Sequence, residues 1–270
     1  MKLAVIHVNA EKYSGLYTQL IDANFRRVKA DTTELRHLYV QRLRRATDTV
    51  FAYPTLLNKL DVLEQVAVAR EEGADAVLVA CSGDPGVAEA RTLLDVPVVG
   101  PMEAALHLAA NYGRKVGIVT VQDRTWVEYC EALTDASGLA GRLAGVRSIS
   151  IPSSQAFTDG FTQPQSIATE VAAQARKLVE EDGANAIVIG SAGLSVMSSA
   201  AGLAAVPETG VPIFDCLSAG LKVAELRAAL QQRLGVPPYS RIGWGERLPD
   251  GDIARLRKLF GLSTGTAGTA

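Results

Sequence analysis

The sequence predicts an α/β protein with two homologous lobes, each built on a parallel sheet flanked by helices. Short apolar runs rich in β-branched residues alternate with longer amphipathic segments, which is typical of buried parallel strands joined by crossover helices. The pattern then restarts, because residues 115–122 match residues 2–9 in kind, position by position. A repeat of about 110 residues is far longer than a solenoid period and indicates two related lobes. We expect a pseudo-twofold arrangement with the active site between the lobes.

Both halves of the chain predict the same order of strands and helices. In the first half, the apolar runs that predict strands are residues 3–8, 33–40, 76–80 and 96–99. The helices expected between and after them are residues 14–27, 54–72, 84–94 and 101–111, and Pro54 suits the first turn of the second helix. The polar, irregular stretch 41–53 predicts a loop.

The second half repeats this order and suggests where the lobes divide. Its expected strands are residues 115–122, 146–151, 186–190 and 211–214, with helices from Arg124 and over 164–181 and a loop at 152–163. We expect residues 1–100 together with 212–262 to form the first lobe and residues 101–211 the second. The tail at 263–270 is small and polar, and we expect it to be disordered.

The composition of the chain argues against several classes of protein, namely those that bind nucleic acids, membranes or metals. The net charge of −2 gives no reason to expect a nucleic acid or an anionic membrane as partner, and no apolar run is long enough to span a bilayer. Three cysteines in 270 residues do not form a disulfide framework, and the three histidines lack metal-ligand spacing. We therefore expect a cytoplasmic homo-oligomer without a metal, acting on a small molecule.

One strand-tip motif occurs twice, and it carries most of the functional argument. Residues 71–86 predict the end of a helix, a Gly turn, a buried strand and then Cys81. Residues 181–193 repeat that design with Ser191 at the corresponding position. Because ligands bind at the carboxyl ends of parallel strands, we expect Cys81 and Ser191 to face one cleft from opposite sides.

Cys81 is the strongest catalytic candidate. We expect it at a helix N-terminus, where the amides of Ser82 and Gly83 and the helix dipole stabilise a thiolate. The alternative is a buried cysteine that only packs, as we expect for Cys130 and Cys216. Ser191 is equally explained as a helix N-cap, but its correspondence with Cys81 favours a functional role.

Further residues are expected to bind the substrate. Asn9 and Thr120, with Val121, follow the first strand of each lobe and could hydrogen-bond a carboxylate, although such residues are also common in turns. The backbone amides of Ala192 and Gly193, like those of Ser82 and Gly83, are expected to bind the carboxylate or ring carbonyls of the substrate. Tyr53 and Phe157 are expected to line the pocket from loops. The arginines at 26–27 and 42–45 are most simply explained as solvated, and His7 and His107 as core or surface residues.

The two copies resemble the paired cysteine motifs of the aspartate/glutamate/hydantoin racemase superfamily. Residues 73–86 resemble the first motif, and Cys-Ser-Gly-Asp-Pro-Gly makes the hydantoin and allantoin racemase branch the most similar. Residues 183–194 resemble the second motif, which normally has Cys at the position of Ser191. Residues 98–105 and 211–215 also resemble that branch, and the resemblance covers about residues 1–230.

The resemblance implies chemistry without a cofactor at a carbon next to a carboxylate or ring carbonyl. In such racemases one thiolate removes the α-proton and the opposite thiol returns a proton on the other face. The expected substrate is a small carboxylate or a cyclic ureide. Relatives include a decarboxylase of arylmalonates, which uses one thiol as proton donor, and maleate isomerase, in which a thiolate adds to a double bond.

This chain departs from the racemase pattern at two places. Residues 7–11 lack the usual Asn-Pro-Asn-Thr, and Ser191 has a hydroxyl that is far less acidic than a thiol. Three explanations stay open: the enzyme uses Cys81 alone, Ser191 is a weak donor in a lopsided racemase, or Ser191 is an engineered replacement of Cys. Our leading hypothesis is a racemase or isomerase with Cys81 as acid/base and Ser191 opposite. A one-thiol decarboxylase, a cis-trans isomerase with a cysteine nucleophile, and a carboxylate sensor are the alternatives.

Overall fold

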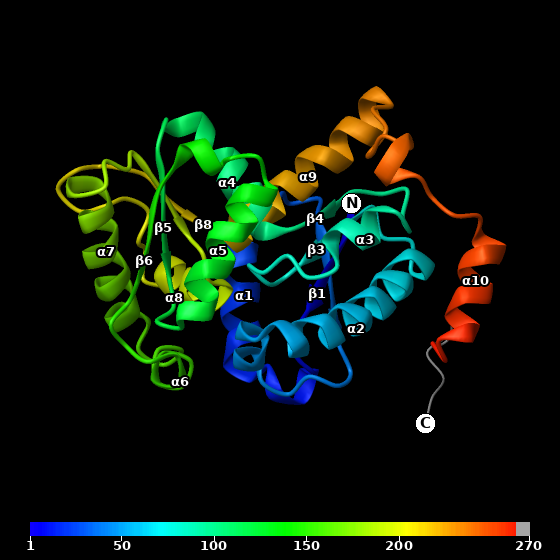
Figure 1. The fold of residues 1–270 in the computed structure, drawn as a ribbon, viewed down its shortest axis with the longest axis horizontal. Coiled ribbons are helices and arrows are strands. Elements are labelled where there is room, and N and C mark those ends of the chain that lie inside the picture. The colour runs from blue at the N-terminus through cyan, green and yellow to red at the C-terminus, as the bar shows by residue number, and fades with distance from the viewer. Residues whose placement is uncertain (263–270) are drawn as a thin grey trace.

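Two four-stranded sheets form the two lobes of the molecule (Figure 1). The computed structural model describes residues 1–262, so the tail predicted to be disordered, 263–270, lies outside the described residues. The strand order is β2-β1-β3-β4 in the first sheet and β6-β5-β7-β8 in the second. Each sheet therefore has the same order relative to its own first strand, which confirms the predicted α/β fold with two related lobes.

All strand pairs within the two sheets are parallel. The first sheet contains β1 (Lys2–His7), β2 (Glu34–Tyr39), β3 (Ala76–Val79) and β4 (Val98–Val99). The second contains β5 (Val116–Thr120), β6 (Leu143–Ser148), β7 (Ala186–Ile189) and β8 (Ile213–Asp215). β3, β5 and β7 are buried along their whole length, as expected for apolar runs covered on both faces.

Helices connect the strands and cover the sheets. The α-helices are α1 (Gly15–Val28), α2 (Ala52–Glu71), α3 (Val87–Arg91), α4 (Pro101–Tyr112), α5 (Arg124–Ala136), α6 (Ser153–Ala156), α7 (Pro164–Glu180), α8 (Ala192–Ala200), α9 (Cys216–Leu234) and α10 (Asp250–Leu259). The short 3-10 helices are η1 (Glu11–Tyr13), η2 (Ala46–Val50), η3 (Ala140–Arg142) and η4 (Gly243–Gly245). The two stretches predicted to be loops, 41–53 and 152–163, thus contain η2 and α6.

One predicted strand is displaced. β6 runs over Leu143–Ser148, three residues before the expected 146–151. It is the edge strand of its sheet and is only half-buried along its length, so its sequence lacks the continuous apolar run that marks the inner strands.

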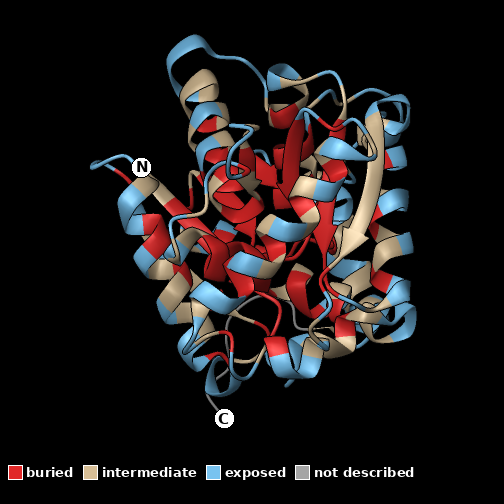
Figure 2. Ribbon diagram, turned by 90° about the vertical axis from the view of Figure 1, so that its left-hand side faces the viewer, coloured by how far each residue is buried: buried red, intermediate tan, exposed pale blue. Residues whose placement is uncertain are grey.

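The predicted lobe boundary at residue 212 also needs a correction. β8 pairs with β7 in the second sheet, so the chain returns towards the first lobe only with α9. α9 packs against α4 and β3, and the buried residues form one continuous core through both lobes (Figure 2). The remaining lobe boundaries stay a prediction.

α1 fastens the first lobe to α8 of the second. The side-chain amide of Asn24 donates to the carbonyl of Val196 at 3.0 Å. Arg27 donates to the carbonyl of Ser199 at 2.9 Å. These bonds and the shared core hold the strand tips of the two lobes in a fixed relation.

The C-terminal segment lies along the first lobe, where α10 packs beside α2 (Figure 1). Arg257 of α10 pairs with Glu64 of α2, with 2.7 Å between guanidinium nitrogen and carboxylate oxygen. None of the helices within residues 1–262 is long and apolar enough to cross a membrane.

Candidate active site

The carboxyl ends of the inner strands converge on one cavity of about 440 Å³ between the lobes. Cys81 and Ser82 follow β3, and Ser191 and Ala192 follow β7, and all four line this cavity. Asn9, after β1, and Val121, after β5, line it as well. Cys81 and Ser191, which were expected at one cleft, thus line the same cavity, and its volume suits a small organic ligand.

Cys81 is almost completely buried, with 7% of its surface exposed. Burial raises the pKa of its thiol to about 12, although a hydrogen bond from the backbone amide of Gly83 acts in the opposite direction. With such a pKa, the Cys81 thiol stays protonated near neutral pH. It can donate a proton directly, whereas acting as a base requires a small thiolate population.

The expectation that a helix N-terminus stabilises a Cys81 thiolate is wrong. α3 begins only at Val87 and has 5 residues. Asp84 and Gly86 both adopt positive φ angles, of 47° and 74°, so the chain turns twice before the helix starts. Cys81 therefore lies in a tight turn rather than at the positive end of a helix dipole.

Asp84 holds this turn in place. Its carboxylate accepts hydrogen bonds from the backbone amides of Met102, at 3.0 Å, and Glu103, at 2.9 Å, in the first turn of α4. A side chain on Gly100 would overlap with the Asp84 carboxyl group, so glycine is required there. Desolvation raises the pKa of Asp84 to about 7. The turn after β3 is thus anchored on α4.

Ser191 is a helix N-cap and a lining residue of the cavity. Its hydroxyl accepts a hydrogen bond from the amide of Leu194 at 3.4 Å, so it is the N-cap of α8, and it also lines the cavity. The helix dipole that Cys81 lacks is therefore present on the opposite side, at Ser191. The pair is asymmetric in chemistry and in setting.

Two of the four amides predicted to bind substrate are already used within the protein. The Ala192 amide donates to the hydroxyl of Ser82 at 3.2 Å, and the Gly83 amide donates to the sulfur of Cys81. Gly193 lies against the ring of Phe157, and a side chain at that position would overlap with the ring. Phe157 also lines the cavity, as predicted.

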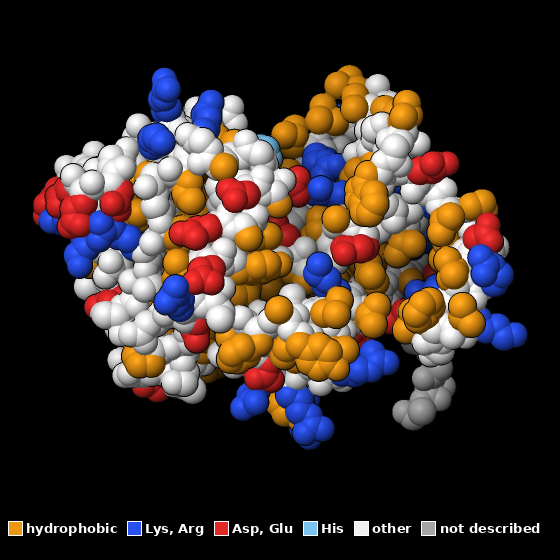
Figure 3. Space-filling view, viewed as in Figure 1, with side chains coloured by type: hydrophobic (Ala, Val, Ile, Leu, Met, Phe, Trp, Pro, Cys, Tyr) orange, Lys and Arg blue, Asp and Glu red, His pale blue; other side chains and the backbone are white. Residues whose placement is uncertain are grey.

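Three predicted binding residues lie outside the cavity lining. Thr120 is fully buried and its hydroxyl donates to the carbonyl of Gly190 at 3.2 Å. Gly83 packs against Trp126, and its carbonyl accepts a hydrogen bond from the hydroxyl of Tyr129 at 3.0 Å. Tyr53 is 70% exposed at the start of α2, where hydrophobic side chains gather on the outer surface (Figure 3). The structure therefore does not place these three residues at the cavity.

Sequence reasoning missed most of the aromatic wall and the two cations. Besides Phe157, the rings that line the cavity are Tyr13, Tyr17, Trp126 and Phe161. Arg44 and Arg45 are exposed, as predicted, but they also line the cavity, which the prediction did not include. The signal available in the sequence was position, because residues 41–50 follow β2 and so lie at the same edge of the sheet as Cys81.

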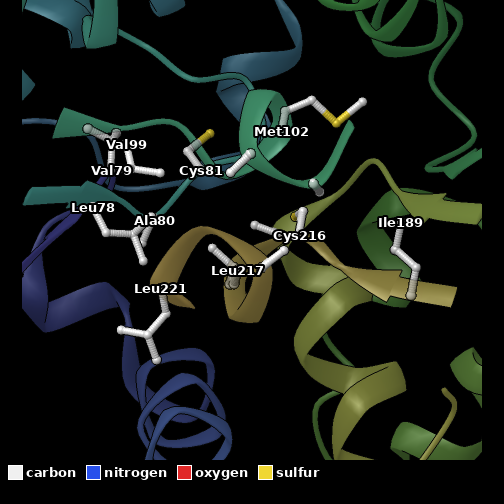
Figure 4. Close-up of a cluster of buried hydrophobic side chains, with 14 of the residues drawn as sticks. Leu78, Val79, Ala80, Cys81, Val99, Met102, Ile189, Cys216, Leu217 and Leu221 are labelled. Carbon is white, nitrogen blue, oxygen red and sulfur yellow. The ribbon is translucent and has the colours of Figure 1, made fainter. Parts of the chain in front are cut away.

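The other two cysteines are packing residues, as predicted. Cys130 and Cys216 are fully buried and do not line the cavity. Figure 4 shows Cys216 at the start of α9, in the same hydrophobic cluster as Cys81 at the end of β3. His7 is also buried, and desolvation lowers its pKa to about 3, which agrees with a core residue.

Comparison with known proteins identifies the family. The family model described as Asp/Glu/Hydantoin racemase matches residues 3–224. The chain belongs to the Asp/Glu/hydantoin racemase family. This agrees with the paired strand-tip motifs that suggested the superfamily.

Hydantoin and allantoin racemases are among the proteins that this chain resembles. The chain is 33% identical to a hydantoin racemase of Pseudomonas sp. (strain NS671) over 64% of its own length and 66% of the relative's, just under two thirds of that protein. It is 35% identical to a hydantoin racemase of Paenarthrobacter aurescens over 66% of this chain and 72% of the relative. The solved structure of an allantoin racemase from Klebsiella pneumoniae superposes with a TM-score of 0.76 at 28% identity, covering 92% of this chain and 94% of that one.

Proposed function

We propose that this protein is a racemase or isomerase that needs no cofactor, acts on a cyclic ureide of the hydantoin class, and uses Cys81 as its acid/base. The observation that carries the proposal is the pair of strand tips, Cys81 and Ser191, which line one cavity from opposite lobes. Similarity to hydantoin and allantoin racemases supports the reaction class. The carbon next to the ring carbonyl would lie between the two side chains.

Asn9 supports a ureide rather than a simple carboxylic acid. It is 4% exposed, and its side-chain nitrogen donates to the carbonyl of Tyr13 at 3.2 Å. Asn9 lines the cavity, and its side-chain oxygen is buried and has no hydrogen-bond partner among the described residues. A buried acceptor without a donor is costly, and a ring N–H of a ureide would satisfy it. A carboxylate ligand has no such donor to offer.

The proposed reaction consists of proton transfers between the substrate carbon, Cys81 and Ser191. The thiolate of Cys81 removes the proton from the carbon, which leaves an enolate on the substrate and a thiol on Cys81. If the Cys81 thiol exchanges its hydrogen with water and then returns one to the same face, the starting enantiomer is recovered with solvent hydrogen in place of its own. If the hydroxyl of Ser191 delivers a proton on the other face, the mirror image forms and Ser191 regains a proton from water.

Inversion should be the slower outcome. The Ser191 hydroxyl is a far weaker acid than a thiol, and only the Leu194 amide and the N-terminus of α8 favour its ionised form. We therefore expect exchange of the α-hydrogen with solvent to outrun inversion, which makes the enzyme a lopsided racemase.

Solvent deuterium incorporation tests the role of Cys81. Each enantiomer of a 5-substituted hydantoin is incubated separately in D2O, and loss of the C5 proton is followed by NMR for the enantiomer that exchanges faster. We expect exchange well above the enzyme-free rate, and its loss by at least about 100-fold in Cys81→Ala, because general acid/base catalysis commonly contributes that much. Cys130→Ala is the matched control and should exchange normally. Exchange at the full rate in folded Cys81→Ala would refute the assignment.

A one-thiol decarboxylase is the second candidate. Two observations favour it, namely the protonated state of the Cys81 thiol, which suits a proton donor, and the presence of a hydroxyl rather than a second thiol at Ser191. Decarboxylation of a malonate-type acid would leave an enolate that Cys81 protonates on one face. Carbon dioxide release from aryl- or alkylmalonates, together with no exchange on hydantoins, would favour this reading over the racemase.

A further inference from the structure

We infer that the ureide substrate carries an anionic group on its ring substituent and that Arg44 binds this group; the inference rests on the proposed function. The starting point is the charge of the cavity. Among the described residues that line it, Arg44 and Arg45 are the charged ones, and both are cations. The remaining lining is aromatic, aliphatic or uncharged polar. A carboxylate would enter such a cavity more favourably than an uncharged group of the same shape.

The two arginines differ in how their charge is balanced. Arg45 pairs with Asp48 three residues on, with 3.2 Å between guanidinium nitrogen and carboxylate oxygen. Arg44 has no hydrogen bond or carboxylate partner within residues 1–262. Its guanidinium group lies instead over the face of the Tyr13 ring, with 5.8 Å between ring centroid and guanidinium carbon. Arg44 therefore keeps an unbalanced positive charge beside the cavity.

A second cation strengthens the field at this point. The ammonium group of Lys12 lies over the same Tyr13 ring, at 6.0 Å, and also lacks a carboxylate partner in the described part of the chain. Arg44 and Lys12 thus place two positive charges around the Tyr13 ring, and of the two only Arg44 lines this cavity, since Lys12 lines a neighbouring one. Two like charges so close together raise the local positive potential, which favours an anionic ligand.

The chain holds Arg44 near the position proposed for the ureide ring. The backbone amide of Ala10 donates to the carbonyl of Leu43 at 2.7 Å, which ties the arginine segment to the end of β1. Tyr13, under Arg44, is also the residue whose carbonyl accepts from Asn9. A ligand with a ring N–H at Asn9 would therefore have its substituent within reach of Arg44.

The topology favours a substituent, rather than the reacting ring, as the anionic group. The ring carbon must lie between Cys81 and Ser191, at the tips of β3 and β7, whereas Arg44 comes from the segment after β2, at the edge of the first sheet. The charge recognised by Arg44 is thus on a part of the substrate that does not react. Such a contact affects ground state and transition state alike and should appear in KM more than in kcat.

Two probes of equal size test the inference. They are 5-(2-carboxyethyl)hydantoin and its primary amide, 5-(2-carbamoylethyl)hydantoin, which differ in charge but hardly in shape. The measured quantity is kcat/KM for deuterium exchange at C5. We expect the wild-type protein to prefer the acid by about tenfold, since a guanidinium–carboxylate contact at a partly exposed site is worth roughly that factor. Added salt should lower the value for the acid and leave the amide unchanged.

Substitution separates Arg44 from general charge effects. In Arg44→Gln the preference for the acid should fall to near unity through a higher KM, with the amide changed by less than about twofold. Arg42→Gln is the matched control, because it removes the same charge from the same loop but Arg42 lies outside this cavity and pairs with Asp61. It should keep the preference of the wild-type protein.

The possible failures are distinguishable. If both probes exchange equally well, or if Arg44→Gln lowers both values alike, the inference about the substituent is wrong and the proposed function stands. If neither probe exchanges above the enzyme-free rate while another 5-substituted hydantoin does, the inference is wrong and the proposed function stands. If no hydantoin exchanges, the proposed function fails and this inference fails with it.

Discussion

The hydroxyl of Ser82 accepts a hydrogen bond from the backbone amide of Ala192, with 3.2 Å between oxygen and nitrogen. Ser82 follows Cys81 in the first lobe, and Ala192 follows Ser191 in the second. This bond therefore joins the neighbours of the proposed acid/base pair across 110 residues of sequence. Both residues are buried, at 2% and 8% exposure, so water is poorly placed to replace it.

Removing this link should affect stability and catalysis together. Ser82→Ala leaves the Ala192 amide buried without a partner, which we expect to lower the free energy of unfolding by about 1–3 kcal/mol. Loss of the bond also loosens the relation between the two strand tips, so kcat for C5 exchange should fall more than KM changes. Urea unfolding and exchange kinetics on the same preparation measure both. Unchanged unfolding and unchanged kcat would show that the bond contributes nothing.

The raised pKa of Cys81 predicts slow, pH-dependent alkylation. Because only thiolates react and burial raises the pKa to about 12, the rate with iodoacetamide should climb about tenfold per pH unit from pH 7 to 10 without levelling off. Peptide mapping should place the label on Cys81, since of the three cysteines only Cys81 lines the cavity, and a bound hydantoin should slow the reaction. A plateau near pH 8.5 would mean an ordinary exposed thiol.

Gly193 should tolerate no side chain while Phe157 stays in place. In Gly193→Ala the new methyl group would overlap with the Phe157 ring, and overpacking of this kind commonly costs about 1–3 kcal/mol. We expect a reduced kcat/KM, partly recovered in the double variant with Phe157→Leu. Gly141→Ala is the control, because no atom lies within 4 Å of the position that its methyl group would take, and it should behave as wild type. Equal effects of the two alanine substitutions would contradict this account.

Asp84 should make the protein less stable as the pH rises towards neutrality. An unfolded aspartate ionises near pH 3.9, whereas desolvation raises the pKa of Asp84 to about 7. Below about pH 4 its contribution is fully present, and between about pH 4 and 7 the unfolded chain releases its proton first, so the contribution is lost. The slope is at most about 1.4 kcal/mol per pH unit, and less because Asp84 keeps some contact with solvent.

Urea unfolding at pH 5 and pH 7.5 measures this dependence in the wild-type protein and in Asp84→Asn. The wild-type protein should lose more stability between the two pH values than the variant does, because asparagine does not titrate. If the wild-type protein gains stability relative to the variant over this interval, the Asp84 carboxyl is ionised throughout and the assignment is wrong.

The inner strands could be predicted because strands that are buried on both faces appear in the sequence as uninterrupted apolar runs. β3 and β7 are uninterrupted apolar runs, and the residues after them, Cys81 and Ser191, were therefore placed correctly at one edge of the two sheets. The edge strand β6 was misplaced by three residues, since half-buried positions carry a weaker pattern. Cys81 and Ser191 could be placed together because parallel strands all end at the same edge of a sheet, and this holds without any motif.

The rest of the site depended on contacts that no local pattern records. Thr120 lies at the carboxyl end of β5, as predicted, but its hydroxyl donates to the carbonyl of Gly190 and not to a ligand. Packing around the side chain decides this orientation. The turn after Cys81 is not a helix start, because Asp84 folds back onto α4. The place of Arg44 at the cavity cannot be predicted from the sequence, because the loop that carries it has no periodicity and only the fold brings it next to Tyr13.

The most direct test of the central claim compares exchange with inversion in the wild-type protein and in Ser191→Cys. One enantiomer of a 5-substituted hydantoin in D2O is followed by NMR for exchange at C5 and by polarimetry for inversion. If Cys81 is the acid/base and Ser191 a weak donor opposite, exchange in the wild-type protein outruns inversion by about tenfold or more, and Ser191→Cys brings the two rates close to each other. Equal rates in the wild-type protein, or a Ser191→Cys variant in which inversion does not rise, would contradict the account.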